Sequence, residues 1–345
     1  MVVVLMIKKS FSLCYYYLAN FYFLLYNKKI LKQYSNQTTT IVSVGNLSFG
    51  GSGKTPFVSL LSSVLNNNNI SNSIISRGYK RLSKNLVVVS DGKKILGNIK
   101  NSGDEALLLA KKNKGNPVVV GDKVDCCRVV CDRFKTDVII IDDGFQSHYI
   151  NKNIEIVLVD VSVPSSEYKL FPLGKLREPL DNIDRADIVI FSKMNLNSNN
   201  NIINLCLSKI NLNSQAVFYS NIESSLFLYK NKVLEPWNSL NFRDPVFCVS
   251  GIANNSSFLN TVKDLGLDVS DYLFFADHYN YKKSDFERII KKMIYLGVKT
   301  IVTTLKDFVK LENSFSGYRL LVVDINHKIK EENLFVKCLL KKINK

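Results

Sequence analysis

Apolar and mixed segments alternate along the first half of the chain. Short apolar runs, which have the length of buried strands, occupy residues 40–44, 73–76, 86–90, 117–120, 137–141, 154–160 and 187–191. Residues 54–66, 103–112 and 123–134 lie between these runs and show the spacing of helices. Because strands that alternate with helices form parallel sheets covered by helices, the pattern predicts an α/β fold with a mostly parallel sheet.

The second half of the chain resumes this alternation after an interruption. Residues 194–214 are polar and rich in asparagine, and residues 225–234 read as a β-hairpin that turns at Lys230 and Asn231. Strands are then predicted at 245–250, 271–275, 299–304 and 319–323, and helices at 255–265 and 283–296. We therefore expect four parts: an N-terminal segment (1–35), a sheet domain (36–205), a linker with the hairpin (206–242) and a second, smaller α/β lobe (243–345).

A glycine-rich turn joins the first predicted strand to the first predicted helix. It consists of Ser48, Phe49, Gly50, Gly51, Ser52, Gly53, Lys54 and Thr55. Glycines let successive backbone N–H groups converge on phosphates, and the helix N-terminus adds a partial positive charge. Lys54 would reach the β- and γ-phosphates of a nucleotide, and the Thr55 hydroxyl would ligate Mg²⁺. The usual motif has glycine where Ser48 stands, so a chance glycine-rich turn is the alternative, but the flanking strand and helix favour the phosphate site.

Two carboxylates follow the apolar run 137–141. A strand that ends in Asp142, Asp143 and Gly144 can be a plain turn, but in nucleotide-binding sheets a neighbouring strand delivers an acid to the metal. Ligands of such sheets bind beyond the carboxyl ends of the strands. We therefore expect Thr55, Asp142 and Asp143 to meet around one metal ion.

Charge and cysteine content narrow the classes of partner. The net charge of +16 favours anionic partners such as nucleic acid, an acidic membrane surface or phosphorylated substrates, although part of the excess belongs to loops rich in Lys and Asn. The lysines form no arginine-rich block and no aromatic–basic pattern, so no nucleic acid is expected as a partner. The seven cysteines lack zinc spacing, and even the cluster of Cys126, Cys127 and Cys131 reads as free thiols in a reducing cytosol.

The segment 11–26 carries no charge and is rich in aromatic residues. Lys8 and Lys9 precede it, and Lys28, Lys29 and Lys32 follow it. It is short for a membrane span and lacks the small-residue cleavage site of a signal peptide. Tyrosines with flanking lysines suit a helix that lies in the headgroup region of a membrane, and the alternative is a helix packed on the protein core.

Short motifs along most of the chain resemble the tetraacyldisaccharide 4′-kinases of lipid A biosynthesis. Their order and spacing carry the resemblance, and they occupy residues 44–56, 76–79, 103–105, 117–120, 142–146, 172–179, 185–187, 275–279 and 304–307. The family usually has Ser or Thr at the position of Ser48. It commonly has His directly after the residue that matches Gln146, whereas here Ser147 intervenes and His148 follows.

The resemblance implies an enzyme that uses ATP and Mg²⁺. Its acceptor would be an acylated glucosamine disaccharide 1-phosphate, phosphorylated on the 4′-hydroxyl to give lipid IVA. Residues 36–205 would be the P-loop kinase domain, and residues 243–345 the lobe that closes over the active site. The N-terminal helix would dock on the cytoplasmic face of the inner membrane as a peripheral or monotopic anchor. The rival hypothesis is an NTPase switch or partitioning protein that regulates a partner.

The resemblance also implies roles for single residues. Asp104, which alone reads as a helix-capping or first-turn acid, would be the catalytic base, and His278 would orient it. Further Mg²⁺ ligands would be Gln146 and Glu178, the latter otherwise forming a surface ion pair with Arg177 or Lys175. The anomeric phosphate of the substrate would be bound by Arg77, Lys175 and Arg177. The resemblance does not settle three other residues. His327 lies in a lysine-rich segment and reads as a surface residue, and Lys306 and Asp307, which follow a strand, are left unassigned between contacting the nucleotide and capping the next element.

Overall fold

The structure, a computed structural model, describes residues 2–196, 198–312 and 314–344. Within these ranges one sheet of thirteen strands runs through the molecule. Its strands, in spatial order, are β11 (Val269–Phe274), β10 (Val246–Ser250), β12 (Thr300–Thr304), β13 (Arg319–Ile329), β8 (Ala216–Lys230), β7 (Ile188–Ser192), β6 (Ile154–Asp160), β1 (Thr40–Asn46), β5 (Val138–Asp142), β2 (Asn72–Ser76), β4 (Pro117–Val120) and β3 (Val87–Asp91), with β9 (Val233–Pro236) paired to β8. Pairing is parallel except at β13–β8, β3–β4 and β8–β9, which confirms the predicted α/β class.

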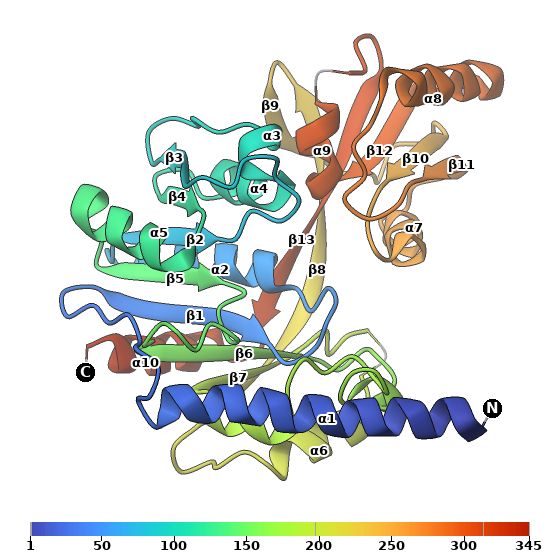
Figure 1. The fold of residues 1–345 in the computed structure, drawn as a ribbon. Coiled ribbons are helices and arrows are strands. Elements are labelled where there is room, and N and C mark those ends of the chain that lie inside the picture. Colours follow the sequence, from blue (N-terminus) through green and yellow to red (C-terminus); the bar gives the residue numbers. More distant parts are fainter. Residues whose placement is uncertain (1, 197, 313, 345) are drawn as a thin grey trace.

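Helices cover the sheet (Figure 1). They are α1 (Val2–Asn27), α2 (Lys54–Asn67), α3 (Ile99–Ser102), α4 (Asp104–Lys112), α5 (Lys123–Val129), α6 (Asn200–Leu207), α7 (Asn255–Asp264), α8 (Lys283–Leu296), α9 (Leu305–Leu311) and α10 (Glu332–Ile343). A π-helical turn, Val130–Phe134, extends α5 to the end predicted for it. The sequence pattern missed α3, α6, α9 and α10, and β13 continues six residues past its predicted end at residue 323, to Ile329.

Two strands connect the halves of the sheet. The hairpin forms at the predicted turn, but β8 begins at Ala216 beside β7 and runs on to β13 in antiparallel register, from Ser220 opposite Ile329 to Tyr229 opposite Leu320. Figure 1 shows these two long strands passing from the body that holds β1 to the one that holds β10. Among the described residues, segments 221–225 and 324–328 pair only with each other in the sheet, and we call this two-stranded stretch the neck.

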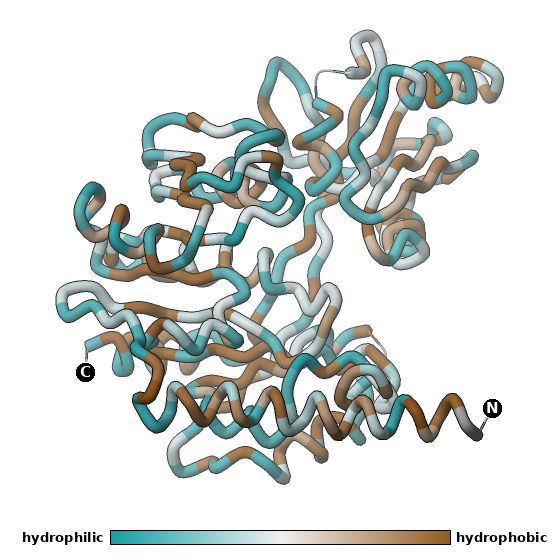
Figure 2. The backbone as a smooth tube through the Cα atoms, viewed as in Figure 1, coloured by the Kyte–Doolittle hydropathy of each residue, from teal (hydrophilic) through white to brown (hydrophobic). Residues whose placement is uncertain are grey.

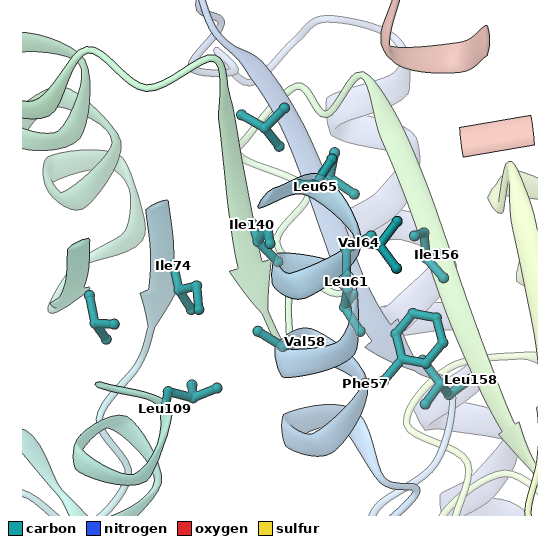
Figure 3. Close-up of a cluster of buried hydrophobic side chains, with 14 of the residues drawn as sticks. Phe57, Val58, Leu61, Val64, Leu65, Ile74, Leu109, Ile140, Ile156 and Leu158 are labelled. Carbon is teal, nitrogen blue, oxygen red and sulfur yellow. The ribbon is translucent and has the colours of Figure 1, made fainter. Parts of the chain in front are cut away.

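The helix that follows the glycine-rich turn is fixed by the core. Phe57, Leu61 and Leu65 of α2 are fully buried, and Figure 3 shows them between α2 and the strand residues Ile140 and Ile156. Burying each such side chain stabilises the fold by roughly 1.5–3 kcal/mol. A helix held this firmly gives the preceding turn a rigid base. A second core, around Phe247, Ile289 and Phe308, fills the other half of the molecule.

The N-terminal helix has one face on the protein and one in solvent. Tyr15 donates to the carbonyl of Arg177 at 2.6 Å, and the ring of Phe23 packs against His148. On the outer face Phe11, Leu18 and Phe21 are about 60% exposed, at 65%, 62% and 59%. Figure 2 shows the apolar and polar residues interleaved along α1. None of the described helices is long and apolar enough to cross a membrane.

All seven cysteines lie in the described part of the chain, and none of them forms a disulfide bond there. Burial raises the pKa of the Cys126 and Cys127 thiols to about 12. Protonated thiols among apolar neighbours are poor metal ligands. Within the described residues, no three or more His, Cys, Asp and Glu side chains are grouped as a metal site.

Candidate active site

The glycine-rich turn lies at the carboxyl end of β1 and opens α2. Gly53 adopts a left-handed conformation, with φ of 86°, directly before the first helical residue, Lys54. The Lys54 ammonium lies 3.1 Å from Asn46 Oδ1 and 3.5 Å from Asp143 Oδ1. Because the first N–H groups of a helix lack helical partners, those of α2 are available to an anion at this end. All eight predicted loop residues, 48–55, therefore lie in one strand–turn–helix unit.

Two carboxylates beside this turn have opposite environments. Asp142 ends β5, directly opposite Val44 of β1, and is buried. Burial, Glu105 and Asp143 together raise the pKa of Asp142 to about 7. Burial also acts on Asp143, but the hydrogen bonds from Arg177, at 3.0 and 2.8 Å, and the charge of Lys54 outweigh it and hold the pKa of Asp143 below its usual range.

Glu178 belongs to a buried network. Its carboxylate accepts from Arg185 at 2.9 Å, from Asn182 at 2.8 Å and from Gln146 at 2.7 Å. The alternative of a surface ion pair with Arg177 or Lys175 is therefore wrong, because Glu178 is buried and its partner is Arg185. The guanidinium of Arg185 also stacks 4.1 Å from the centre of the Phe145 ring. Sequence reasoning missed Arg185, although it opens one of the shared motifs.

The three residues predicted to bind the substrate phosphate have different partners in the structure. Arg177 is engaged by Asp143, and Lys175 pairs with Glu167 at 2.8 Å. Arg77 follows β2 and is exposed. Burial lowers the pKa of Lys123, and the charge of Arg77 adds to this effect. The structure brings Arg177 to the glycine-rich turn, where its guanidinium lies over the Phe49 ring, and does not bring Arg77 there.

Asp104 and His278 meet across the two halves of the sheet. Asp104 is the first residue of α4, and His278 follows β11 in the other half. His278 Nδ1 lies 2.9 Å from Asp104 Oδ2, and Lys310 Nζ of α9 lies 2.7 Å from the same oxygen. Burial by itself raises the pKa of Asp104, but the bonds from His278 and Lys310 outweigh it and hold that pKa well below its usual range.

The partners of His278 define its hydrogen-bonding roles. An ionised carboxylate only accepts, so Nδ1 carries the proton that is donated to Asp104. Nε2 lies 3.0 Å from the Lys306 ammonium, which only donates, so Nε2 accepts. Asp277 also binds Lys306, at 3.0 Å. Lys306 thus belongs to this cluster. Asp307 lies in the first turn of α9, where its carboxylate accepts from Gly251 N and Thr304 Oγ1, and the cap of α9 is Thr304, whose hydroxyl accepts from the N–H of Asp307.

Two further histidines differ from the sequence-based expectation. His327, expected at the surface, is 5% exposed and donates to the Gly53 carbonyl. The expectation was wrong because the lysine-rich segment around it forms the end of β13, where alternate side chains point inward. His148 lies against Arg185 and the Tyr22 and Phe23 rings of α1.

The donor set beside the turn fits Mg²⁺. Asp142 Oδ1 and Gln146 Oε1 are buried oxygens without a hydrogen-bond partner in the described structure. Mg²⁺ takes oxygen ligands and usually keeps several waters, so a few protein oxygens suffice. A cation next to Asp142 would also favour its ionised form.

Comparison with known proteins decides the family. The sequence matches the family described as tetraacyldisaccharide-1-P 4′-kinase over residues 4–344. The chain belongs to this family. A tetraacyldisaccharide 4′-kinase of Halothermothrix orenii is 33% identical over 300 residues, which cover 83% of this chain and 78% of the relative. One of Desulfotalea psychrophila is 31% identical over 292 residues, 84% and 83% of the two chains.

A solved structure agrees with this family assignment. The crystal structure of the "apo" form of LpxK from Aquifex aeolicus in complex with ATP superposes with a TM-score of 0.78 at 28% identity, covering 99% of this chain and 100% of that one. The resemblance read from the short motifs is thereby confirmed.

Proposed function

We propose that this chain is an ATP-dependent kinase that transfers the γ-phosphate to the 4′-hydroxyl of tetraacyldisaccharide 1-phosphate, giving lipid IVA and ADP. The observation that carries the proposal is the family match over residues 4–344, which includes both the glycine-rich turn and the residues around His278. The rival, an NTPase switch or partitioning protein, is not favoured, because the matched relatives are named as kinases of a sugar hydroxyl.

In this proposal the glycine-rich turn binds the phosphates of ATP. Backbone N–H groups at the start of α2 face the phosphate oxygens, and the Lys54 ammonium balances the charge on the β- and γ-phosphates. Asp143 and Asn46 hold that ammonium at the mouth of the turn. Arg177 and Lys175 are the proposed contacts of the substrate's 1-phosphate, with Arg77 as a third cation at the end of β2.

Asp104 and His278 form the proposed base. Asp104 accepts the proton from the attacking hydroxyl, and His278 fixes the direction of its carboxylate. Lys310 keeps the carboxylate ionised, and therefore able to accept. Since Lys306 occupies the Nε2 side of the ring, His278 is held in one orientation.

Mg²⁺ would be held by Thr55, Asp142 and Gln146, with Asp143 and Glu178 as further candidates that are each engaged by an arginine. When bound, the ion neutralises negative charge on the phosphates. The protein's own contribution is a set of oxygen ligands at the carboxyl ends of β1 and β5.

We also propose that the protein binds the cytoplasmic face of the inner membrane through α1. The exposed apolar side chains of α1 and the exposed Lys8, Lys9, Lys28, Lys29 and Lys32 support this. A lipid acceptor resides in that surface, so a helix lying along it would bring the enzyme to its substrate.

The direct test is transfer of radiolabelled γ-phosphate from ATP to purified tetraacyldisaccharide 1-phosphate. We expect a labelled lipid whose formation depends on Mg²⁺ and on the acceptor. Hydrolysis of ATP without labelled lipid, and stimulated by a protein partner, would instead support the switch.

A further inference from the structure

The buried His327 links the neck of the sheet to the glycine-rich turn. It lies on β13, opposite Ile222 of β8. Its Nε2 lies 2.9 Å from the carbonyl oxygen of Gly53, and its Nδ1 lies 3.0 Å from the Ser220 hydroxyl. The ring also packs edge-on against Phe57 in the first turn of α2, with centres 5.4 Å apart.

The partners of His327 require a single neutral tautomer. A carbonyl oxygen only accepts, so Nε2 carries the proton, and Nδ1 accepts from Ser220. Burial, aided by the charges of Lys193 and Lys112, lowers the pKa of His327 to about 4. The imidazole is therefore neutral near pH 7 and donates one hydrogen bond, to the turn.

The space between His327 and Gly53 is filled. A Cβ atom placed on Gly53 would lie 2.6 Å from Nε2, and the φ of 86° at Gly53 already disfavours other residues. The Gly53 carbonyl also accepts from the N–H of Phe57 at 3.1 Å, the first hydrogen bond of α2. The imidazole is thus seated at the point where the turn becomes a helix.

Neighbouring carbonyls of the turn are bound in the same way. Lys193 donates to Gly51 O at 2.8 Å, and the Ser192 hydroxyl lies 3.3 Å from Ser52 O. In a trans peptide the C=O and the following N–H point in opposite directions. Holding the carbonyls of Ser52 and Gly53 from one side therefore directs the N–H groups of Gly53 and Lys54 to the other side, where a phosphate binds.

We propose that His327 is a positioning residue for the nucleotide, which sets the plane of the Gly53–Lys54 peptide and ties the phosphate-binding turn to the neck. The inference rests on the proposed binding of ATP at residues 48–55. It adds a residue from the C-terminal part of the chain, 274 positions away from Gly53, to the parts that shape the nucleotide site.

The test compares His327→Gln, which keeps an N–H donor at a similar reach, with His327→Leu and His327→Met, which keep bulk without a donor. Leu321→Ala is the matched control, because it creates a cavity on the same strand without contact to the turn. The measurements are the Kd of AMP-PNP, the KM for ATP and for the lipid, and the melting temperature.

We expect His327→Leu and His327→Met to raise the Kd of AMP-PNP and the KM for ATP about three- to tenfold, the range for one lost hydrogen bond. The KM for the lipid should stay within about twofold, and His327→Gln should recover most of the nucleotide affinity. Leu321→Ala should lower the melting temperature and leave the Kd unchanged.

Two results would overturn the inference while leaving the kinase proposal intact. One is an unchanged Kd in the Leu and Met variants with a lowered melting temperature, which would make His327 structural only. The other is equal loss in the Gln variant, which would exclude the donated bond as the cause. A wild-type chain that fails to bind AMP-PNP would overturn both proposals.

Discussion

At the scale of single residues, the cations around the glycine-rich turn are held by acids rather than left in solvent. Lys54 and Arg177 share Asp143, and Arg185 is buried against Glu178. Such pairs fix the direction of long side chains, and removing one partner leaves the other charge without its partner. Substituting Lys54, Arg177 or Arg185 should therefore affect function in two ways, by removing a contact and by leaving an acidic side chain without its partner.

Lys54→Ala should lower kcat for phosphate transfer about 100-fold or more, because a preorganised cation at the phosphates is removed. The circular dichroism spectrum should be unchanged, since the Lys54 side chain contributes no core packing. Lys209→Ala, which removes a partly exposed lysine paired with Asp181, is the control and should retain activity. Near-normal transfer by Lys54→Ala would mean that this turn is not the phosphate site.

The half-buried His148 and the buried His327 should make stability depend on pH. Burial lowers the pKa of His148 to about 3 and that of His327 to about 4, whereas the pKa of a histidine in the unfolded chain is about 6.5. Between these values the unfolded chain binds protons that the folded chain does not, so the free energy of unfolding falls as the pH drops from 6.5 toward 4. Each imidazole contributes a slope of up to about 1.4 kcal/mol per pH unit.

Urea unfolding at pH 7 and pH 5 measures this slope. His148→Leu should lose less stability between the two pH values than the wild-type chain, even if it is less stable at pH 7. An identical loss in both proteins would contradict a neutral His148 in the folded chain.

At the residue level, the sequence predicted where Lys54 and Asp142 lie in the fold, because a helix start and a strand end depend on neighbouring residues. Their roles in binding phosphate and metal stay predictions. His327 was misplaced because its lysine neighbours suggested solvent, and its burial depends on Gly53, which is remote in sequence. Lys310 and Arg185 escaped notice for the same reason, since each acts through a partner on another element.

At the scale of elements, the pattern predicted strands better than the late helices. Strands of a parallel sheet are apolar throughout, and each predicted run lies within about two residues of an observed strand start. The helix α6 was missed because asparagine is a poor helix former, and only the packing of Ile202 and Cys206 reveals it. The boundary predicted after residue 35 separates the N-terminal segment from the sheet domain. It lies beside Tyr34, whose backbone is hydrogen-bonded to that of Tyr149 and Asn151 in the sheet domain.

The exposed face of α1 gives a prediction at this scale. The double substitution Leu18→Glu with Phe21→Glu should reduce sedimentation with vesicles of anionic phospholipid, because it places charge where the helix would enter the interface. Activity on lipid dispersed in detergent should suffer less than activity on vesicles. The contacts of Tyr15 and Phe23 with the protein are left in place.

Tyr295→Glu on α8 is the matched control, since Tyr295 is 88% exposed on the other half of the molecule. The lysines that flank α1 should each contribute roughly 1 kcal/mol to binding of the anionic membrane surface, and this contribution should weaken with added salt. Full sedimentation of the double variant would place the membrane contact elsewhere.

At the scale of the whole molecule, the site is assembled from both halves. Asp104→Ala and His278→Ala should each lower kcat by a factor of about 100 to 10,000, the usual contribution of a general base. The double variant should lose less than the product of the single losses, because the two side chains act as one unit. Fully multiplicative losses would argue against a coupled base.

A matched control separates this coupling from mere docking of the halves. Lys111 of α4 pairs with Glu312 at 2.6 Å, a contact that also crosses between the halves but does not involve Asp104. Lys111→Ala should change kcat only a few-fold.

The sequence predicted two lobes and the hairpin between them. It did not predict that one sheet continues through both lobes, because the pairing of β8 with β13 joins segments far apart in the chain.

The neck has a mechanical consequence. If flexible loops joined the two halves, their relative orientation would vary widely, and Asp104 and His278 would be in contact only part of the time. A two-stranded ribbon is instead elastic. It bends and twists at little energetic cost for small displacements, and its cross-strand hydrogen bonds restore one relative orientation of the halves. Opening and closing would then follow one hinge motion, and stiffening the neck would slow the release of bulky products more than the transfer step.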